Sequence, residues 1–123
     1  MPIPREIRGQ KYISLFTFRK SGAAVPTPVW FGEEDDKLYV KTRNDSGKYK
    51  RIRNNPQVRV APCTIRGKII GPEFVATARI LPKEDWPRAQ ALIERKYWLA
   101  RIFSFLKNKK NVYIEIADFN PRP

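Results

Sequence analysis

The chain has 123 residues, with 25 Lys and Arg against 12 Asp and Glu, so its formal net charge is +13. It has no His and a single Cys, which excludes Ser-His-Asp and Cys-His catalysis, an internal disulfide and a zinc site of the cysteine type within this chain. The length suits one domain over residues 1–123, and no apolar run is long enough to cross a membrane.

The first half of the chain predicts short strands that are joined by turns. β-Branched and aromatic residues favour strands over 11–19, 24–31 and 37–42. Between them, the segments 20–22 and 32–36 indicate turns, the second of which is acidic. Turns of this length are typical of antiparallel hairpins.

The second half predicts helices among further strands, and Asp45 or Ser46 can cap the first helix. In chain order, the predicted elements are a short basic helix over 48–54, a strand over 57–65, a strand over 69–81 that is interrupted at 71–72, a helix over 83–107, a strand over 111–117 and an irregular tail over 118–123. Strands that are mostly linked by hairpins predict a mainly β fold, with an antiparallel sheet closed into a small barrel and helices packed at its mouth or side.

The segment 41–53 gives the strongest indication of a binding site, because it carries six basic residues against one acid. A helix N-terminus presents free N–H groups and a partial positive charge, which favour an anion. Gly47 lets the backbone approach a ligand closely, Lys48 adds a full charge, and Thr42 and Ser46 can donate hydroxyl hydrogen bonds. The pattern predicts a phosphate site, although a capped helix with a solvated basic face would show the same residues.

A second candidate surface is the segment Pro26, Thr27, Pro28, Val29 and Trp30. The two prolines place two missing N–H groups on the same side of the strand, so that side cannot join a ladder. The unpaired edge and Trp30 could contact a flat aromatic ligand. The alternative is an edge strand that proline protects against aggregation.

No pair of carboxylates has the spacing of a general acid and base, and no catalytic or metal-binding residue is predicted. If the protein is an enzyme, a bound cofactor would therefore supply the chemistry, and the chain would bind and orient it. The positive charge independently favours an anionic partner.

These motifs resemble the pyridoxamine 5'-phosphate oxidase-like, FMN-binding split-barrel superfamily, and in particular its short flavin- or deazaflavin-dependent oxidoreductases. The resemblance runs from about residue 12 to 81. Its landmarks are TFRKSG at 17–22, PTPVWF at 26–31, LYVKT at 38–42, SGK at 46–48, KRIRNNPQV at 50–58 and VAPC at 60–63. The order and spacing of these pieces carry the resemblance, since each piece alone is weak.

The resemblance implies a six-stranded antiparallel split β-barrel that works as a homodimer, with two cofactor sites at the subunit interface. It implies that residues 26–30 run along the ring of FMN or of the deazaflavin coenzyme F420. It also implies that Thr42, Ser46, Gly47 and Lys48 hold the phosphate, with Arg51 as a second cation nearby. The acidic tail of F420 would be attracted by the positive charge of the chain.

We therefore expect an FMN- or F420-dependent oxidoreductase that transfers hydride to or from a small organic substrate. Two alternatives remain: a non-catalytic flavin-binding or storage protein, and a basic small β-barrel that binds single-stranded nucleic acid. A single unpaired Cys fits a reducing compartment, so we expect a cytoplasmic protein with no membrane partner.

Overall fold

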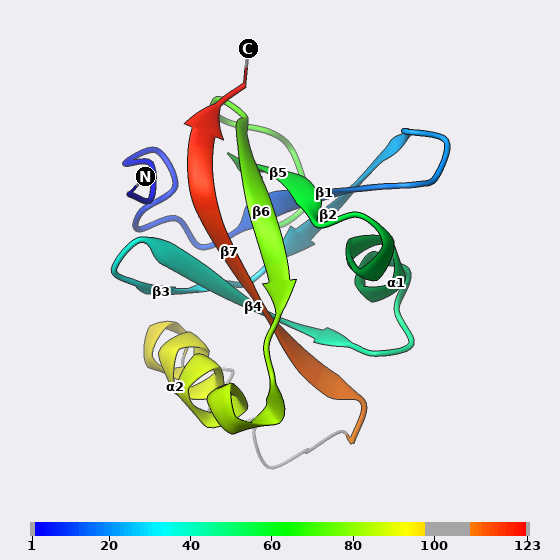
Figure 1. The fold of residues 1–123 in the computed structure, drawn as a ribbon. Helices are drawn as coiled ribbons and strands as arrows, with labels where there is room; N and C mark the ends of the chain where they lie inside the picture. Colours follow the sequence, from blue (N-terminus) through cyan, green and yellow to red (C-terminus); the bar gives the residue numbers. More distant parts are fainter. Residues whose placement is uncertain (1, 98–108, 123) are drawn as a thin grey trace.

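The computed structural model describes residues 2–97 and 109–122, and this part of the chain forms one curled antiparallel sheet (Figure 1). Its seven strands are β1 (Ile13–Phe18), β2 (Ala24–Val29), β3 (Gly32–Glu34), β4 (Lys37–Arg43), β5 (Gln57–Pro62), β6 (Phe74–Ile80) and β7 (Asn111–Pro121). They lie in the order β2-β1-β5-β6-β7-β4-β3. The predicted mainly β, antiparallel split-barrel architecture is confirmed, with a seventh strand added to the six expected.

Two α-helices are described, and they lie on opposite sides of the strands (Figure 1). The first, α1 (Gly47–Asn54), joins β4 to β5 and packs against β1, β4 and β6. The second, α2 (Trp86–Lys96), follows β6 through a 3₁₀ turn, η1 (Lys83–Asp85), and packs against β3, β4 and β7. Among the described residues, no helix has the length and apolar character needed to span a membrane.

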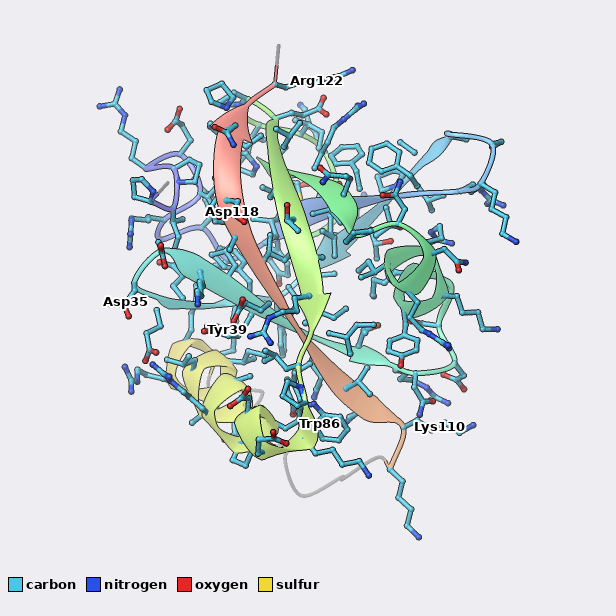
Figure 2. The ribbon with its side chains drawn as sticks, in the orientation of Figure 1. Asp35, Tyr39, Trp86, Lys110, Asp118 and Arg122 are labelled. Atoms are coloured by element: carbon cyan, nitrogen blue, oxygen red, sulfur yellow. The ribbon has the colours of Figure 1, made fainter. Side chains whose placement is uncertain are left out.

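Strands β4 and β7 are buried on both faces, and this places two apolar clusters back to back. Leu38 and Ile116 face the inside of the curled sheet, whereas Tyr39 and Tyr113 face α2. The division follows from the alternation of side chains along a strand. In Figure 2, Trp86 lies between the start of α2 and the sheet, where its indole N–H donates to the carbonyl of Leu81 at 2.9 Å.

The prolines of β2 lie at a sheet edge, as predicted. Pro26 is opposite Phe16 and Pro28 is opposite Ser14, and within the described residues β2 pairs with no strand other than β1. Because proline has no N–H, the outer side of β2 lacks two of the donors that an added strand would need.

The acidic segment at 32–36 is not only a turn, and here the sequence prediction was wrong. Gly32–Glu34 forms β3 and pairs with β4, and Asp35 adopts a φ of 55° at the tip of this hairpin (Figure 2). Glu33 pairs with Lys96 and Glu34 pairs with Arg88, both on α2. The helix, which is distant in the sequence, therefore neutralises two carboxylates that the sequence alone predicts to be exposed to solvent.

The ends of several elements also differ from the prediction. The strand predicted over 57–65 ends at Pro62, and the one predicted over 69–81 begins at Phe74. The tail at 118–123 is not irregular, because β7 continues to Pro121 past a register shift opposite 75–77. Burial of Phe119 inside the sheet accounts for this extension. The helix predicted over 83–107 is described only to Lys96, and its remainder beyond Tyr97 lies outside the described residues.

Tyr97 and Gly32 fix α2 against the strands. The Tyr97 hydroxyl donates to the carbonyl of Lys11 at 2.6 Å and accepts from the N–H of Phe31 at 3.2 Å. Its ring stacks on Trp30 with centroids 4.8 Å apart. Gly32 lies so close to the helix that a Cβ there would come within 2.9 Å of the backbone of Leu92.

The Tyr97 hydroxyl predicts both a stability loss and a pH dependence. Tyr97→Phe should lower the free energy of unfolding by about 1–3 kcal/mol near neutral pH, because the buried N–H of Phe31 and the carbonyl of Lys11 lose their partner. Burial raises the pKa of Tyr97 to about 12 from the ordinary 10. The native state holds this proton more tightly than the unfolded state does. The hydroxyl therefore contributes its full stabilisation below pH 10, and this stabilisation is lost as the pH rises toward 12.

Chemical denaturation at a series of pH values measures both effects. Tyr49→Phe is the control, because the Tyr49 hydroxyl makes no hydrogen bond within the part of the chain that the structure describes. The stability gap between the wild type and Tyr97→Phe should narrow above pH 10. A gap that is absent at neutral pH, or constant with pH, would contradict the structure of this contact.

Candidate functional site

A cavity of about 390 Å³ is lined by residues of several strands and by one residue of each helix. Its lining residues come from the start of β1, the end of β2, β4, α1, α2 and the loop after β5; they are Tyr12, Pro28, Val29, Trp30, Lys41, Lys48, Ile65 and Ile93. Four of the residues singled out in the sequence, Pro28, Val29, Trp30 and Lys48, thus meet in one place. Pro26 and Thr27 lie further back on β2 and do not line the cavity.

The apolar wall of the cavity is held rigidly. Val29 is buried, and Trp30 lies nearly parallel to the Tyr97 ring, with an interplanar angle of 8°. The two hydrogen bonds of the Tyr97 hydroxyl fix that ring in turn. Offset stacking of this kind restrains the indole and gives the cavity a flat apolar wall.

Two lysines line the cavity, and Lys48 differs from the exposed Lys41 in being half-buried. No carboxylate within the described residues forms a salt bridge with Lys48. Burial lowers the pKa of Lys48, and the positive charge of Arg51 lowers it further. Both causes destabilise the charged ammonium form of Lys48. An anion bound beside it would stabilise that form.

The predicted hydroxyl donors are engaged within the turn. The Ser46 hydroxyl donates to the carbonyl of Arg43 at 2.8 Å and accepts from the N–H of Tyr49 at 3.2 Å. The hydroxyl of Thr42, which is buried, lies 3.0 Å from that of Ser46. Ser46 is therefore the N-cap of α1, and its single proton is already used.

Backbone donors remain at the start of α1. Within the described residues, the N–H groups of Gly47 and Lys48 have no hydrogen-bond partner, as is usual in the first turn of a helix. These two N–H groups, rather than the two hydroxyls, are the donors free to meet an anion. One of them belongs to Lys48, which carries the half-buried ammonium group, and the other to the residue before it.

Gly47 and Arg51 line a second hollow, of about 590 Å³, which lies between α1 and the β1–β2 hairpin. The Arg51 Nε donates to the Thr17 hydroxyl at 2.7 Å. A Cβ at residue 47 would come 2.7 Å from Arg51 Nη1, so the absence of a side chain there lets the guanidinium lie against the helix start. The predicted phosphate residues are thus divided between two neighbouring depressions.

Four lining residues of the first cavity were missed as site residues in the sequence: Tyr12, Lys41, Ile65 and Ile93. Tyr12 had a usable signal, because pairing of Ile13 with Val29 places it near Trp30. Ile65 and Ile93 had none, since a loop and a distant helix bring them in. Lys41 belongs to the basic segment but was not selected from it.

The lining residues allow binding but contain no obvious acid or base pair. No carboxylate lines this cavity among the described residues, and no group of three metal-ligating side chains occurs in them. Cys63 is buried, which raises the pKa of its thiol. The arrangement suits a planar apolar ring that carries an anionic group.

The family model for pyridoxamine 5'-phosphate oxidase matches residues 3–114 of the chain. No curated protein sequence matches this chain. The match covers most of the chain, including every residue that lines the first cavity.

Solved structures share this fold at low identity. Atu2129 from Agrobacterium tumefaciens, of unknown function, is 16% identical with a TM-score of 0.71, and the match covers 90% of this chain but 51% of that one. HutZ, described as the heme storage protein from Vibrio cholerae, is 15% identical with a TM-score of 0.72, covering 100% and 92%. The conserved hypothetical protein Rv2991 from Mycobacterium tuberculosis is 19% identical with a TM-score of 0.70, covering 96% and 77%. This chain thus spans about half the length of Atu2129, and at such identities the likeness concerns the fold.

Ser46→Ala should lower the free energy of unfolding by about 1 kcal/mol, because the N–H of Tyr49 loses its cap. Ser46→Asp should retain most of the stability, since a carboxylate caps a helix well and opposes the basic charge of α1. Urea denaturation of the three proteins measures the difference. Equal stability of the wild type and Ser46→Ala would show that the cap contributes nothing.

Proposed function

The chain belongs to the pyridoxamine 5'-phosphate oxidase family, and from its site we propose that it is an oxidoreductase that uses FMN or coenzyme F420. The observation that carries this proposal is the combination, in one cavity, of a flat apolar wall at Trp30 with the half-buried Lys48, which forms no salt bridge with any residue that the structure describes. A flavin or deazaflavin has both complementary features, a planar ring system and a phosphate. When bound, such a cofactor supplies hydride transfer with a small organic substrate.

The residues of the chain would divide the binding between them. Lys48 and the N–H groups of Gly47 and Lys48 would hold the phosphate. Pro28, Val29 and Trp30 would form the wall beside the ring. Tyr97 acts indirectly, because it holds the indole in place.

Other residues of the expected cofactor site have positioning roles in this proposal. Thr42 and Ser46 shape the turn through their hydroxyls, and Arg51 lies behind the helix start. Pro26, together with Pro28, keeps the outer edge of β2 open, and Thr27 between them is opposite Leu15 of β1. The Tyr12 side chain also lines the cavity and is available to contact the substrate.

A second copy of the chain would cover the open side of this cavity. Three isoleucines of the loop after β5 are exposed, with Ile65 at 66%, Ile69 at 39% and Ile70 at 52%. Ile65 also lines the cavity, so the apolar surface adjoins the site. Clustered exposed apolar side chains mark interaction surfaces, and identical chains commonly associate as symmetric dimers.

A non-catalytic storage protein is the second candidate, because HutZ, which shares the fold, is described as a heme storage protein. The chain has no His to ligate heme iron. Among the residues that line the cavity, only Tyr12 is of a type that ligates heme iron through oxygen. These residues favour a flavin. Repeated oxidation of NADH with an electron acceptor by the FMN-loaded protein would support the enzyme, whereas tight hemin binding with no turnover would support storage.

Lys48→Ala should weaken FMN binding by about 1–3 kcal/mol, roughly 5- to 150-fold, because a charge-assisted contact to phosphate is lost. Binding of riboflavin, which lacks the phosphate, should change little. Lys50→Ala is the matched control, since Lys50 is on the same helix but lines the other hollow. Fluorescence titration with both flavins measures the effect.

In the same titrations, Trp30→Ala should weaken FMN and riboflavin by similar factors, because the wall contacts the ring and not the phosphate. Trp30→Phe should retain much of the affinity for both. If Lys48→Ala weakens both flavins equally, or Trp30→Ala affects FMN alone, the orientation proposed for the cofactor is wrong.

Ile70→Asp should raise the dimer dissociation constant at least about tenfold, because the dimer would bury a charge. Lys83→Ala, which changes the net charge by the same amount at an exposed position, should leave it unchanged. Sedimentation equilibrium measures both constants. A wild-type protein that stays monomeric at all concentrations would refute the dimer.

A further inference from the structure

We propose that the hollow between α1 and the β1–β2 hairpin binds the phosphodiester backbone of a single-stranded nucleic acid. This activity goes beyond the proposed oxidoreductase and uses the neighbouring hollow, which shares only Gly47 with the proposed phosphate site. The hollow has a volume of about 590 Å³. It is lined by Phe18, Arg19, Lys20, Gly22, Gly47, Lys50, Arg51, Asn54 and Asn55.

The positive charge of the hollow comes from both of its sides. Arg19 and Lys20 belong to the hairpin, and Lys50 and Arg51 belong to α1. No Asp or Glu is among the residues that line it. Four cations on two elements, without a carboxylate between them, suit several linked anionic groups better than a single one.

The carboxylate nearest to α1 in the chain, Asp45, is engaged elsewhere. Asp45 pairs with Arg43 and Lys110, and the Arg43 guanidinium holds the pKa of this carboxyl well below its usual range. Glu73 pairs with Arg59 and Arg122. No salt bridge of the described residues involves any of the four cations in the hollow, so their charge is available to a ligand.

Helix α1 bears an electrostatic cost for this arrangement. Its eight residues include Lys48, Lys50, Arg51 and Arg53 and no acid. Lys50 and Arg53 lie three residues apart on one face of the helix, so their like charges repel one another. A bound polyanion would remove this repulsion along the helix.

The uncharged groups of the hollow favour a nucleic acid. Asn54 and Asn55 offer side-chain amides, and the Asn55 Oδ1 accepts from the N–H of Gln57, which leaves its NH₂ group available. Phe18 provides a ring with the Arg59 guanidinium 5.0 Å from its centroid. Amides, aromatic rings and guanidinium planes contact bases, which are exposed in single strands.

An anionic membrane surface fits the hollow less well. Membrane-binding surfaces place large apolar side chains beside their cations. The described large apolar residues that are exposed are Ile65, Ile69 and Ile70, and none of them lines this hollow.

The test is fluorescence anisotropy of a labelled single-stranded oligonucleotide over a series of salt concentrations. The variant Arg19→Ala, Lys20→Ala, Lys50→Ala removes three cations from the hollow and keeps Arg51, which holds Thr17. The control Lys83→Ala, Arg95→Ala, Lys109→Ala removes three exposed cations elsewhere. The hollow variant should lose at least about tenfold more affinity than the control, and its log–log salt slope should fall by about 2, at roughly 0.7 per phosphate contact.

Equal losses in the two variants would overturn the proposal, because binding would then depend on net charge alone. Tighter binding of a duplex, of polyglutamate or of anionic lipid vesicles would also overturn it. FMN affinity of the hollow variant should stay unchanged, so this result and the flavin titrations of Lys48→Ala can succeed or fail separately.

Discussion

The candidate site depends on the half-buried ammonium group of Lys48, which has no carboxylate partner in the described ranges 2–97 and 109–122. Burial and the charge of Arg51 disfavour the protonated form of Lys48, yet the fold holds it in place. Ile52 anchors α1 in the core, and the Ser46 cap fixes where the helix begins. Partial burial of a charge without a counter-ion costs free energy, since water would solvate the charge better. The geometry is therefore prepared for an anion.

The sequence predicted the local parts of this site and missed those that distant elements bring in. The edge prolines and the basic start of the helix can be predicted from the sequence, because each depends only on residues that are neighbours in the chain. The hydroxyls of Thr42 and Ser46 show the limit of such reading, because a cap and a phosphate ligand have the same residue types. Likewise, β3 was hidden because α2 neutralises its acidic residues. The contribution of Ile93 to the cavity follows from tertiary packing alone.

Helix α1 organises the charge of the whole molecule. Lys48 faces the cavity with the apolar wall, whereas Gly47, Lys50 and Arg51 face the hollow beside the hairpin. On the opposite side of the strands, α2 contributes cations that pair with Glu33 and Glu34. The high net charge is thus not spread evenly: it is compensated around α2 and left open around α1. One short helix consequently separates two different anion-attracting environments.

Close contact between β3 and α2 has a consequence for how this molecule can diverge. Gly32 leaves no room for a Cβ beneath the helix backbone, and the same helix carries Ile93 into the cavity wall. Any larger residue at position 32 would push the helix outward and reshape the cavity from the far edge of the sheet. Tolerance to substitution at position 32 is therefore low, because a single methyl group there would already displace α2 and with it the Ile93 side of the cavity.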